Sequence, residues 1–175
     1  MALYNEGQLG AVVGQAQKLA EQYPHAFVIW NILGAANKGL GRINEAVEAF
    51  KEATQLNPSN PEGYNNLGTT LQDQGKLAEA MEALNKALSL KPDFAEAYNN
   101  MGNALQDQGK LKEAMDALNK ALSLKPDFAE AYNNMGNTLQ EQNELEESIE
   151  AYKKALSLKP DYAEAYNNMG NALKD

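Results

Sequence analysis

Apolar residues recur along the chain with the spacing of one helix face, in two stripes that follow each other. In the stretch 95–107, apolar and small residues fall at i, i+3, i+4 and i+7, which is one face of an α-helix: Tyr98, Met101, Gly102 and Leu105. A second stripe with helical spacing comes next: Leu111, Ala114, Met115, Leu118, Ala121 and Leu122. The two stripes predict a pair of amphipathic helices, which the short link between them makes antiparallel.

The residues around these stripes indicate where the helices begin and end. Gly109 separates the stripes, and a left-handed C-terminal cap favours glycine there. Pro126 follows the second stripe and does not allow that helix to continue. Ser or Asp three residues before Glu is the pattern of a capping box at the start of a helix. The pattern predicts such a box at the first helix of each following pair: Ser59-x-x-Glu62, Asp93-x-x-Glu96, Asp127-x-x-Glu130 and Asp161-x-x-Glu164.

The whole pattern repeats with a period of 34 residues. Single residue types recur at this interval, as at Tyr64, Tyr98, Tyr132 and Tyr166. A period of this length is typical of solenoids, in which each copy covers the apolar face of its neighbour. We therefore divide the chain into a partial repeat with only a second helix, four complete repeats, and a partial repeat with only a first helix: 1–26, 27–60, 61–94, 95–128, 129–162 and 163–175.

Small residues in the middle of the helices predict that the two helices of a pair approach closely. Glycine inside a helix costs about 1 kcal/mol relative to alanine, yet every complete repeat has one: Gly34, Gly68, Gly102 and Gly136. Small residues are expected opposite them on the second helix: Ala46, Ala80, Ala114 and Ser148. A further alanine in each second helix is expected to contact the next repeat: Ala53, Ala87, Ala121 and Ala155.

These positions resemble the tetratricopeptide repeat (TPR), which has the same period. The repeat at 27–60 carries the pattern as Trp30-x-x-Leu33-Gly34, Ala46-x-x-x-Phe50 and Pro58, and later repeats replace the tryptophan by tyrosine. The style of the repeats is similar to the TPR arm of O-linked N-acetylglucosamine transferases and of related bacterial proteins. The resemblance implies an all-α fold, a right-handed α-solenoid of antiparallel helix pairs that forms the TPR superhelix.

In this family the first helices line a concave groove, and the resemblance implies which residues face it. Most are amides: Asn65, Asn66, Thr69, Asn99, Asn100, Asn103, Asn133, Asn134, Asn137, Asn167, Asn168 and Asn171. Asparagine is a mediocre helix former, so its repetition calls for a reason. An amide offers donors and an acceptor, and we expect a ladder at Asn66, Asn100, Asn134 and Asn168 to hold the backbone of an extended peptide. The alternative is that these side chains bind no peptide and that some merely face water.

Acidic residues are expected on the same face: Glu62, Asp73, Glu96, Asp107, Glu130 and Glu141. They would favour a polar or basic peptide. For the glutamates, an alternative is that they only cap the helix and interact with its dipole. The family's clamp for C-terminal carboxylates uses Lys and Arg where this chain has mostly Glu and Asn, so an acidic chaperone tail is a poor ligand. The repeat at 27–60 instead has an apolar patch at Val28, Ile32 and Ala35.

The composition of the chain argues against most other classes of function. The chain of 175 residues has 15 Lys and Arg against 24 Asp and Glu, a formal net charge of −9, which opposes nucleic-acid binding. It has no cysteine and one histidine, His25, and no phosphate loop or nucleophile elbow. We therefore expect no catalytic residue, no metal site and no cofactor. No apolar run reaches the roughly 18 residues of a membrane span, and no signal peptide is recognised, so we expect no membrane partner and a cytoplasmic location.

The sequence thus predicts a non-catalytic protein-interaction scaffold that binds a peptide or protein segment in its groove. Two alternatives stay open. The chain could be the substrate-presenting arm of a larger transferase-type enzyme. Its two partial repeats could also complement each other between molecules, because 163–175 lacks a second helix and 1–26 lacks a first one. Such contacts would produce a head-to-tail homo-oligomer.

Overall fold

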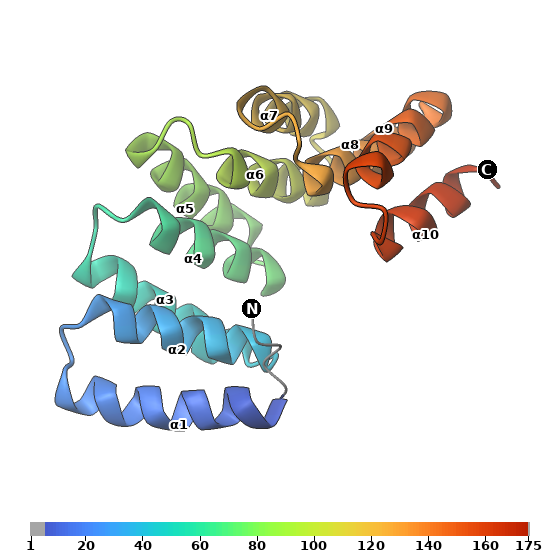
Figure 1. The fold of residues 1–175 in the computed structure, drawn as a ribbon. Helices are drawn as coiled ribbons and strands as arrows, with labels where there is room; N and C mark the ends of the chain where they lie inside the picture. The colour runs from blue at the N-terminus through green and yellow to red at the C-terminus, as the bar shows by residue number, and fades with distance from the viewer. Residues whose placement is uncertain (1–5, 175) are drawn as a thin grey trace. The chain divides into compact units, whose positions relative to one another are not determined.

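The computed structural model describes residues 6–174, and all regular secondary structure within them is helical (Figure 1). The helices in this part of the chain are α1 (Glu6–Gln22), α2 (Phe27–Gly39), α3 (Ile43–Leu56), α4 (Pro61–Asp73), α5 (Leu77–Leu90), α6 (Ala95–Asp107), α7 (Leu111–Leu124), α8 (Ala129–Glu141), α9 (Leu145–Leu158) and α10 (Ala163–Ala172). The predicted all-α fold is confirmed.

The helices form two compact units. Unit 1, Met1–Lys91, contains α1 to α5, and unit 2, Pro92–Asp175, contains α6 to α10. Within unit 1, α2 packs against α3 and α4 against α5, while α1 contacts α2 and α3 contacts α4. Within unit 2, α6 packs against α7 and α8 against α9, while α7 contacts α8 and α9 contacts α10. Each unit is therefore a stack of helix pairs, in which a second helix also covers the first helix of the next pair, as in an α-solenoid.

The turn inside each complete pair contains the predicted left-handed residue. The backbone angle φ is positive at Gly41, Gly75, Gly109 and Asn143. At Gly75, where φ is +78°, the Gly75 amide donates to the Gln72 carbonyl at 2.8 Å and the Lys76 amide donates to the Leu71 carbonyl at 2.9 Å. These bonds satisfy carbonyl groups at the end of α4, so the chain can reverse and begin α5 at Leu77.

The predicted capping boxes are wrong. The N-cap residues of α6, α8 and α10 are Phe94, Phe128 and Tyr162, and none of them makes a side-chain capping bond. The aspartate of each proposed box lies one residue before the N-cap position, too early to cap. Only α4 has a side-chain cap among these helices, and there Asn60 Oδ1, rather than Ser59, accepts a bond from the Gly63 amide at 2.6 Å.

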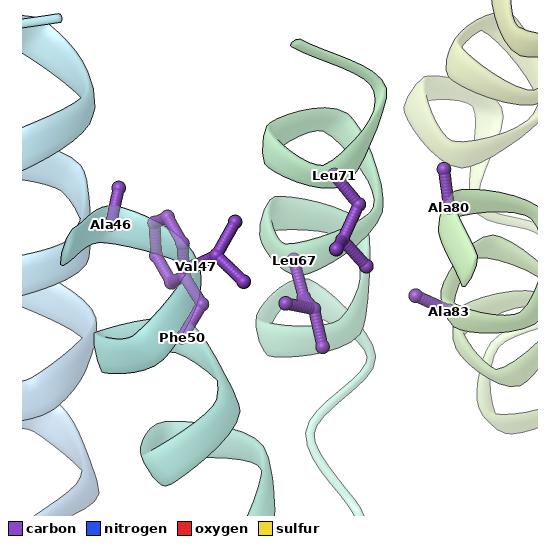
Figure 2. Packing of buried hydrophobic residues seen from close by; sticks show 7 residues of the cluster. All are labelled: Ala46, Val47, Phe50, Leu67, Leu71, Ala80 and Ala83. Atoms are coloured by element: carbon purple, nitrogen blue, oxygen red, sulfur yellow. The ribbon is translucent and has the colours of Figure 1, made fainter. Parts of the chain in front are cut away.

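Alanine, leucine and phenylalanine fill the space between the pairs. Figure 2 shows the cluster in unit 1, in which α3, α4 and α5 each contribute residues: Ala46, Val47 and Phe50 from α3, Leu67 and Leu71 from α4, and Ala80 and Ala83 from α5. A cluster in unit 2 joins α6, α7 and α8: Ala95, Ala121, Phe128 and Ala131. The alanines predicted to contact the next repeat are all buried: Ala53, Ala87, Ala121 and Ala155. The close fit of these stripes is what holds consecutive first helices side by side.

Two mid-helix glycines show how closely the helices of a pair approach. A Cβ atom at Gly68 would lie 2.8 Å from Leu84 Cγ and 3.2 Å from the Ala80 carbonyl oxygen. A Cβ atom at Gly136 would collide with the Tyr152 ring. The predicted close approach is confirmed. The side chain nearest to each glycine, however, is not the small residue of the second helix. It is the larger residue one turn later, Leu84 over Gly68 and Tyr152 over Gly136.

Candidate functional site

The residues expected to bind a peptide lie on the first helices of the pairs. Within unit 2, α6 contacts α8 and α8 contacts α10, so polar positions from three helices lie next to one another. Within unit 1, α2 contacts α4 and forms a second, shorter face of the same kind. The longer face, carried by α6, α8 and α10, is called the polar face of unit 2 below.

The predicted asparagines differ widely in burial. Asn133 is 0% exposed and Asn99 is 6% exposed, so neither side chain lies open to solvent. Two others, Asn167 and Asn171, are exposed. The rest are half-buried: Asn65, Asn66, Thr69, Asn100, Asn103, Asn134, Asn137 and Asn168. A half-buried amide is fixed in position and still reachable by a ligand.

The asparagines connect neighbouring first helices by hydrogen bonds. In unit 1, Asn66 Nδ2 donates to Asn31 Oδ1 at 3.3 Å. In unit 2, Asn134 Nδ2 donates to Asn99 Oδ1 at 2.8 Å, and Asn168 Nδ2 donates to Asn133 Oδ1 at 3.1 Å. Each donor lies one repeat plus one residue after its acceptor. This offset was visible in the sequence, but it was not recognised as a sign of bonds between repeats.

These bonds give the asparagines a structural role, and the sequence alone did not indicate this role. They satisfy buried amide groups, which would otherwise be costly. Asn134 uses its Nδ2 group toward the preceding repeat, and no bond to its Oδ1 occurs within residues 6–174. Asn168 is more fully engaged, because its Nδ2 also donates to Asn137 Oδ1 at 3.0 Å. A peptide would therefore meet the ladder mainly through the oxygen atoms of the amides.

Most of the predicted acidic residues are neutralised by lysine. The Lys–Glu pairs that recur from repeat to repeat join the end of the second helix to the first helix of the same repeat: Lys91–Glu62 at 3.7 Å, Lys125–Glu96 at 3.0 Å and Lys159–Glu130 at 3.2 Å. Asp73 pairs with Lys38 at 2.9 Å. Three of the four glutamates of the predicted capping boxes, Glu62, Glu96 and Glu130, thus bind a lysine side chain and contribute little net negative charge.

Two of these lysines also lie over aromatic rings. The Lys125 ammonium is 4.4 Å from the centre of the Phe128 ring, and that of Lys159 is 4.5 Å from the Tyr162 ring. Such contacts attract a cation and hold its stem in place. They explain why the lysine that follows each second helix is aimed at its own repeat.

Glu141 and Glu164 bring carboxylates to the polar face of unit 2, and their hydrogen bonds come from amides. Glu141 Oε1 accepts a bond from Gln106 Nε2 at 2.6 Å, and Glu164 Oε1 accepts one from Asn133 Nδ2 at 3.1 Å. Neither residue takes part in an ion pair in this part of the chain. In the other repeats the paired lysine lies 29 residues after the equivalent glutamate, and for Glu164 that position falls beyond residue 175.

Tyr152 brings a hydroxyl group to this same region, and the sequence analysis missed it. Its ring is fully buried at the position where other repeats have Leu84 and Leu118. The Tyr152 hydroxyl donates to Asn137 Oδ1 at 2.8 Å and to Gln140 Oε1 at 3.2 Å. Burial raises the pKa of this hydroxyl, and the charge of Glu164 acts in the same direction. A leucine-to-tyrosine change between otherwise similar repeats was the sequence signal for it.

Tyr162 is affected by the same negative charge. Its pKa is raised to about 12, first by burial and then by the carboxylates of Glu164 and Glu130. Both tyrosines are therefore neutral near pH 7. Burial is the main cause of both raised pKa values, and the charge of Glu164 adds to each.

The hypothesis of head-to-tail association concerns α10. Tyr166 and Leu173 are 52% and 64% exposed on this helix and at its end. Leu173 also lines a cavity of about 810 Å³, together with Met135 and Leu139 of α8 and Ile149 of α9. The predicted apolar patch on α2 is likewise exposed, at Val28 and Ile32. Self-association through these surfaces stays a prediction.

The described part of the chain holds no group of three or more His, Cys, Asp or Glu residues arranged to bind a metal ion. Among its helices, none is long and apolar enough to cross a membrane. Its candidate site therefore consists of amides, carboxylates and a buried phenol.

Comparison with known proteins identifies the repeat. Residues 10–172 match the family model described as the C-terminal domain of cilia and flagella-associated protein 70, a TPR domain. Tetratricopeptide repeat protein 33 from Homo sapiens is 40% identical over 50 residues, which are 29% of this chain and 19% of that protein. The chain thus matches less than a fifth of the length of this curated relative.

Several solved structures have the same fold. TTC0263, a thermophilic TPR protein in Thermus thermophilus, has a TM-score of 0.83 at 23% identity, with 97% of this chain and 92% of that chain covered. MamA has a TM-score of 0.68 at 32% identity, with 85% and 81% covered. YrrB, a TPR protein with an unusual peptide-binding site, has a TM-score of 0.71 at 24% identity, with 92% and 83% covered.

Proposed function

Since the chain belongs to the TPR family described by the C-terminal domain of cilia and flagella-associated protein 70, we propose that it is a non-catalytic scaffold for protein interactions. Its polar face of unit 2 binds an extended peptide or a protein segment. YrrB, which shares the fold, is described as having a peptide-binding site. That likeness supports a peptide ligand here without identifying it.

The observation that carries this proposal is the row of fixed amides on α6, α8 and α10. Hydrogen bonds between repeats hold Asn99, Asn134 and Asn168 in place. A ligand that binds fixed side chains loses less conformational freedom from the protein side. The amide oxygens can accept hydrogen bonds from peptide N–H groups, which every sequence supplies. Such a surface binds backbone first and leaves specificity to neighbouring groups.

Charge supports a polar or basic ligand over an acidic one. The chain carries a net charge of −9, and the carboxylate of Glu141 takes part in no ion pair within residues 6–174. Opposite charge on a ligand speeds its encounter and selects against acidic competitors. A segment rich in Lys or Arg therefore fits this face best.

A peptide array tests the proposal directly. The purified chain is applied to immobilised peptides of twelve residues, and binders are then titrated in solution by fluorescence anisotropy. Asn134→Ala should weaken binding about two- to tenfold, the range expected for one hydrogen bond. Asn119→Ala removes an exposed asparagine from the second helix α7 and should leave affinity unchanged.

Melting curves of both variants separate a lost contact from a lost fold, because Asn134 also bonds to Asn99. The proposal fails if no peptide binds to the folded chain. It also fails if Asn119→Ala and Asn134→Ala reduce affinity equally while both remain folded.

A further inference from the structure

A hollow of about 440 Å³ lies in unit 1 and is lined by residues of α1, α2 and α3. Trp30 and the buried residues Leu33 and Ala49 give it an apolar wall. Asn37 of α2 and Gln74, the C-cap residue of α4, add amide groups. Its size and this mixture of an apolar wall with a few polar groups are typical of ligand sites. The hollow shares no residue with the polar face of unit 2.

Asn37 is a buried amide without a hydrogen-bond partner in the described chain. It is 3% exposed, and no hydrogen bond to its side chain occurs among residues 8–174. Its backbone carbonyl, in contrast, accepts bonds from the Leu40 and Arg42 amides. The other three complete repeats have leucine at the equivalent position: Leu71, Leu105 and Leu139. A buried amide without a partner is costly, so an asparagine in place of this leucine calls for a group that bonds to it.

A second amide that lines the hollow is only half satisfied. Gln74 Nε2 donates to Asn44 Oδ1 at 2.6 Å, which ties the turn after α4 to α3. Gln74 Oε1 is buried and has no hydrogen-bond partner within the described residues. Two amides of one hollow therefore lack partners, and they come from different helix pairs. This makes the hollow of unit 1 the place where the described chain leaves buried hydrogen-bonding capacity unused.

We infer that this hollow binds a tyrosine side chain of a protein partner. A phenol hydroxyl both donates and accepts, so it can bond to the oxygen or the nitrogen of the Asn37 amide. The tyrosine ring supplies an apolar body that suits Trp30, Leu33 and Ala49. The Trp30 ring is already held in place, because its Nε1 donates to the Pro24 carbonyl at 2.9 Å. Aromatic pairs of this kind contribute beyond the area that they bury.

Other side chains match the hollow less well. Phenylalanine and leucine would leave the Asn37 amide without a partner. Lysine, arginine and tryptophan donate hydrogen bonds but do not accept them. Serine, threonine, asparagine and glutamine do both, but they bring little apolar surface to the wall. Glu45 and Glu48 also line the hollow, and their charge opposes a phosphorylated tyrosine.

Nuclear magnetic resonance on the whole chain tests the inference. Trp30 is the only tryptophan of the sequence, so its indole signal reports on the hollow without overlap. The probe is Nα-acetyl-tyrosine methylamide, and the comparison compounds are the phenylalanine and phosphotyrosine derivatives. We expect saturable shifts of the Trp30 indole and Asn37 side-chain amide signals with tyrosine. Phenylalanine should bind about tenfold more weakly, because it leaves the buried amide unpaired. Phosphotyrosine should give no shifts.

Two variants that each replace an amide by leucine complete the test. Asn37→Leu restores the residue of the other repeats and should weaken tyrosine binding about tenfold. The same variant should raise the melting temperature, because it removes a buried amide without a partner. Gln55→Leu makes the same kind of change at an exposed position of α3 that does not line the hollow. This control should leave the tyrosine affinity unchanged.

Several results would overturn the inference. They are equal affinities for tyrosine and phenylalanine, shifts that avoid Trp30 and Asn37, or equal affinities of Asn37→Leu and Gln55→Leu for tyrosine. An absence of binding by any probe would mean that the hollow holds only water. A lower melting temperature of Asn37→Leu would show that the asparagine supports the fold instead. Peptide binding to the polar face of unit 2 is measured separately with Asn134→Ala, so the two proposals can fail independently.

Discussion

Replacing Gly68 by alanine tests the close approach of the two helices in a pair. The variant has two opposing effects. Alanine is about 1 kcal/mol more favourable than glycine inside a helix. The added Cβ, however, would lie 2.8 Å from Leu84 Cγ and 3.2 Å from the Ala80 carbonyl oxygen. Overpacking of this kind costs about 1–3 kcal/mol. Gly68→Ala should therefore lower the free energy of unfolding by about 0–2 kcal/mol.

Gly14→Ala is the matched control, since it lies inside α1 of the same unit and nothing is within 4 Å of its added Cβ. This variant should gain up to about 1 kcal/mol. The difference between the two variants, about 1–3 kcal/mol, is the quantity to measure. Urea unfolding followed by circular dichroism gives it, provided that the slopes agree. If Gly68→Ala is as stable as Gly14→Ala, the packing argument for the glycines is wrong.

The remaining predictions concern caps and titration. Asn60→Ala should lower the free energy of unfolding by about 1 kcal/mol because it removes the cap of α4. Asp93→Ala removes no cap and should change the free energy of unfolding by less than about 0.5 kcal/mol. Thermal unfolding compares the two variants, and equal losses of stability would show that Asp93 does cap α6. The folded pKa of Tyr162 is about 12 against an ordinary 10.0, so the unfolded chain loses this proton first. Its contribution to stability is complete below pH 10 and falls between pH 10 and 12. Tyr162→Phe should lose stability less steeply over that interval in urea unfolding at several pH values, and an unchanged slope would contradict the raised pKa.

Local features of the fold could be predicted from the sequence. The helix pairs, the left-handed residues at Gly75 and Gly109, and the buried alanines depend on spacing within one repeat, and the structure confirms them. The N-cap residues could not be predicted in this way, because an error of one residue changes the outcome. Phe94 is the N-cap of α6, so Asp93 lies one residue before the capping position. The box motif alone did not indicate which residue would adopt N-cap geometry.

The chemistry of the candidate site depends on contacts between elements, and these were not visible in any single motif. Asn99 bonds to Asn134 and Asn133 bonds to Asn168, and each of these pairs joins residues of two different repeats. The hydroxyl of Tyr152 reaches the amides of α8 only because its ring crosses directly over Gly136. Charge counting alone therefore predicted an acidic face, whereas lysine pairs with four of the predicted acidic residues: Glu62, Asp73, Glu96 and Glu130.

The hydroxyl of Tyr152 has a consequence for how an extended ligand would be aligned. Near-identical repeats offer the same amides at regular intervals, so a chain gripped through its backbone alone could slide by one interval and make equivalent contacts. Tyr152 occurs once among the aligned positions, where Leu84, Leu118 and Phe50 stand elsewhere. A ligand group that contacts the amides bonded to Tyr152 would fix the frame in which every other residue of the ligand meets the scaffold.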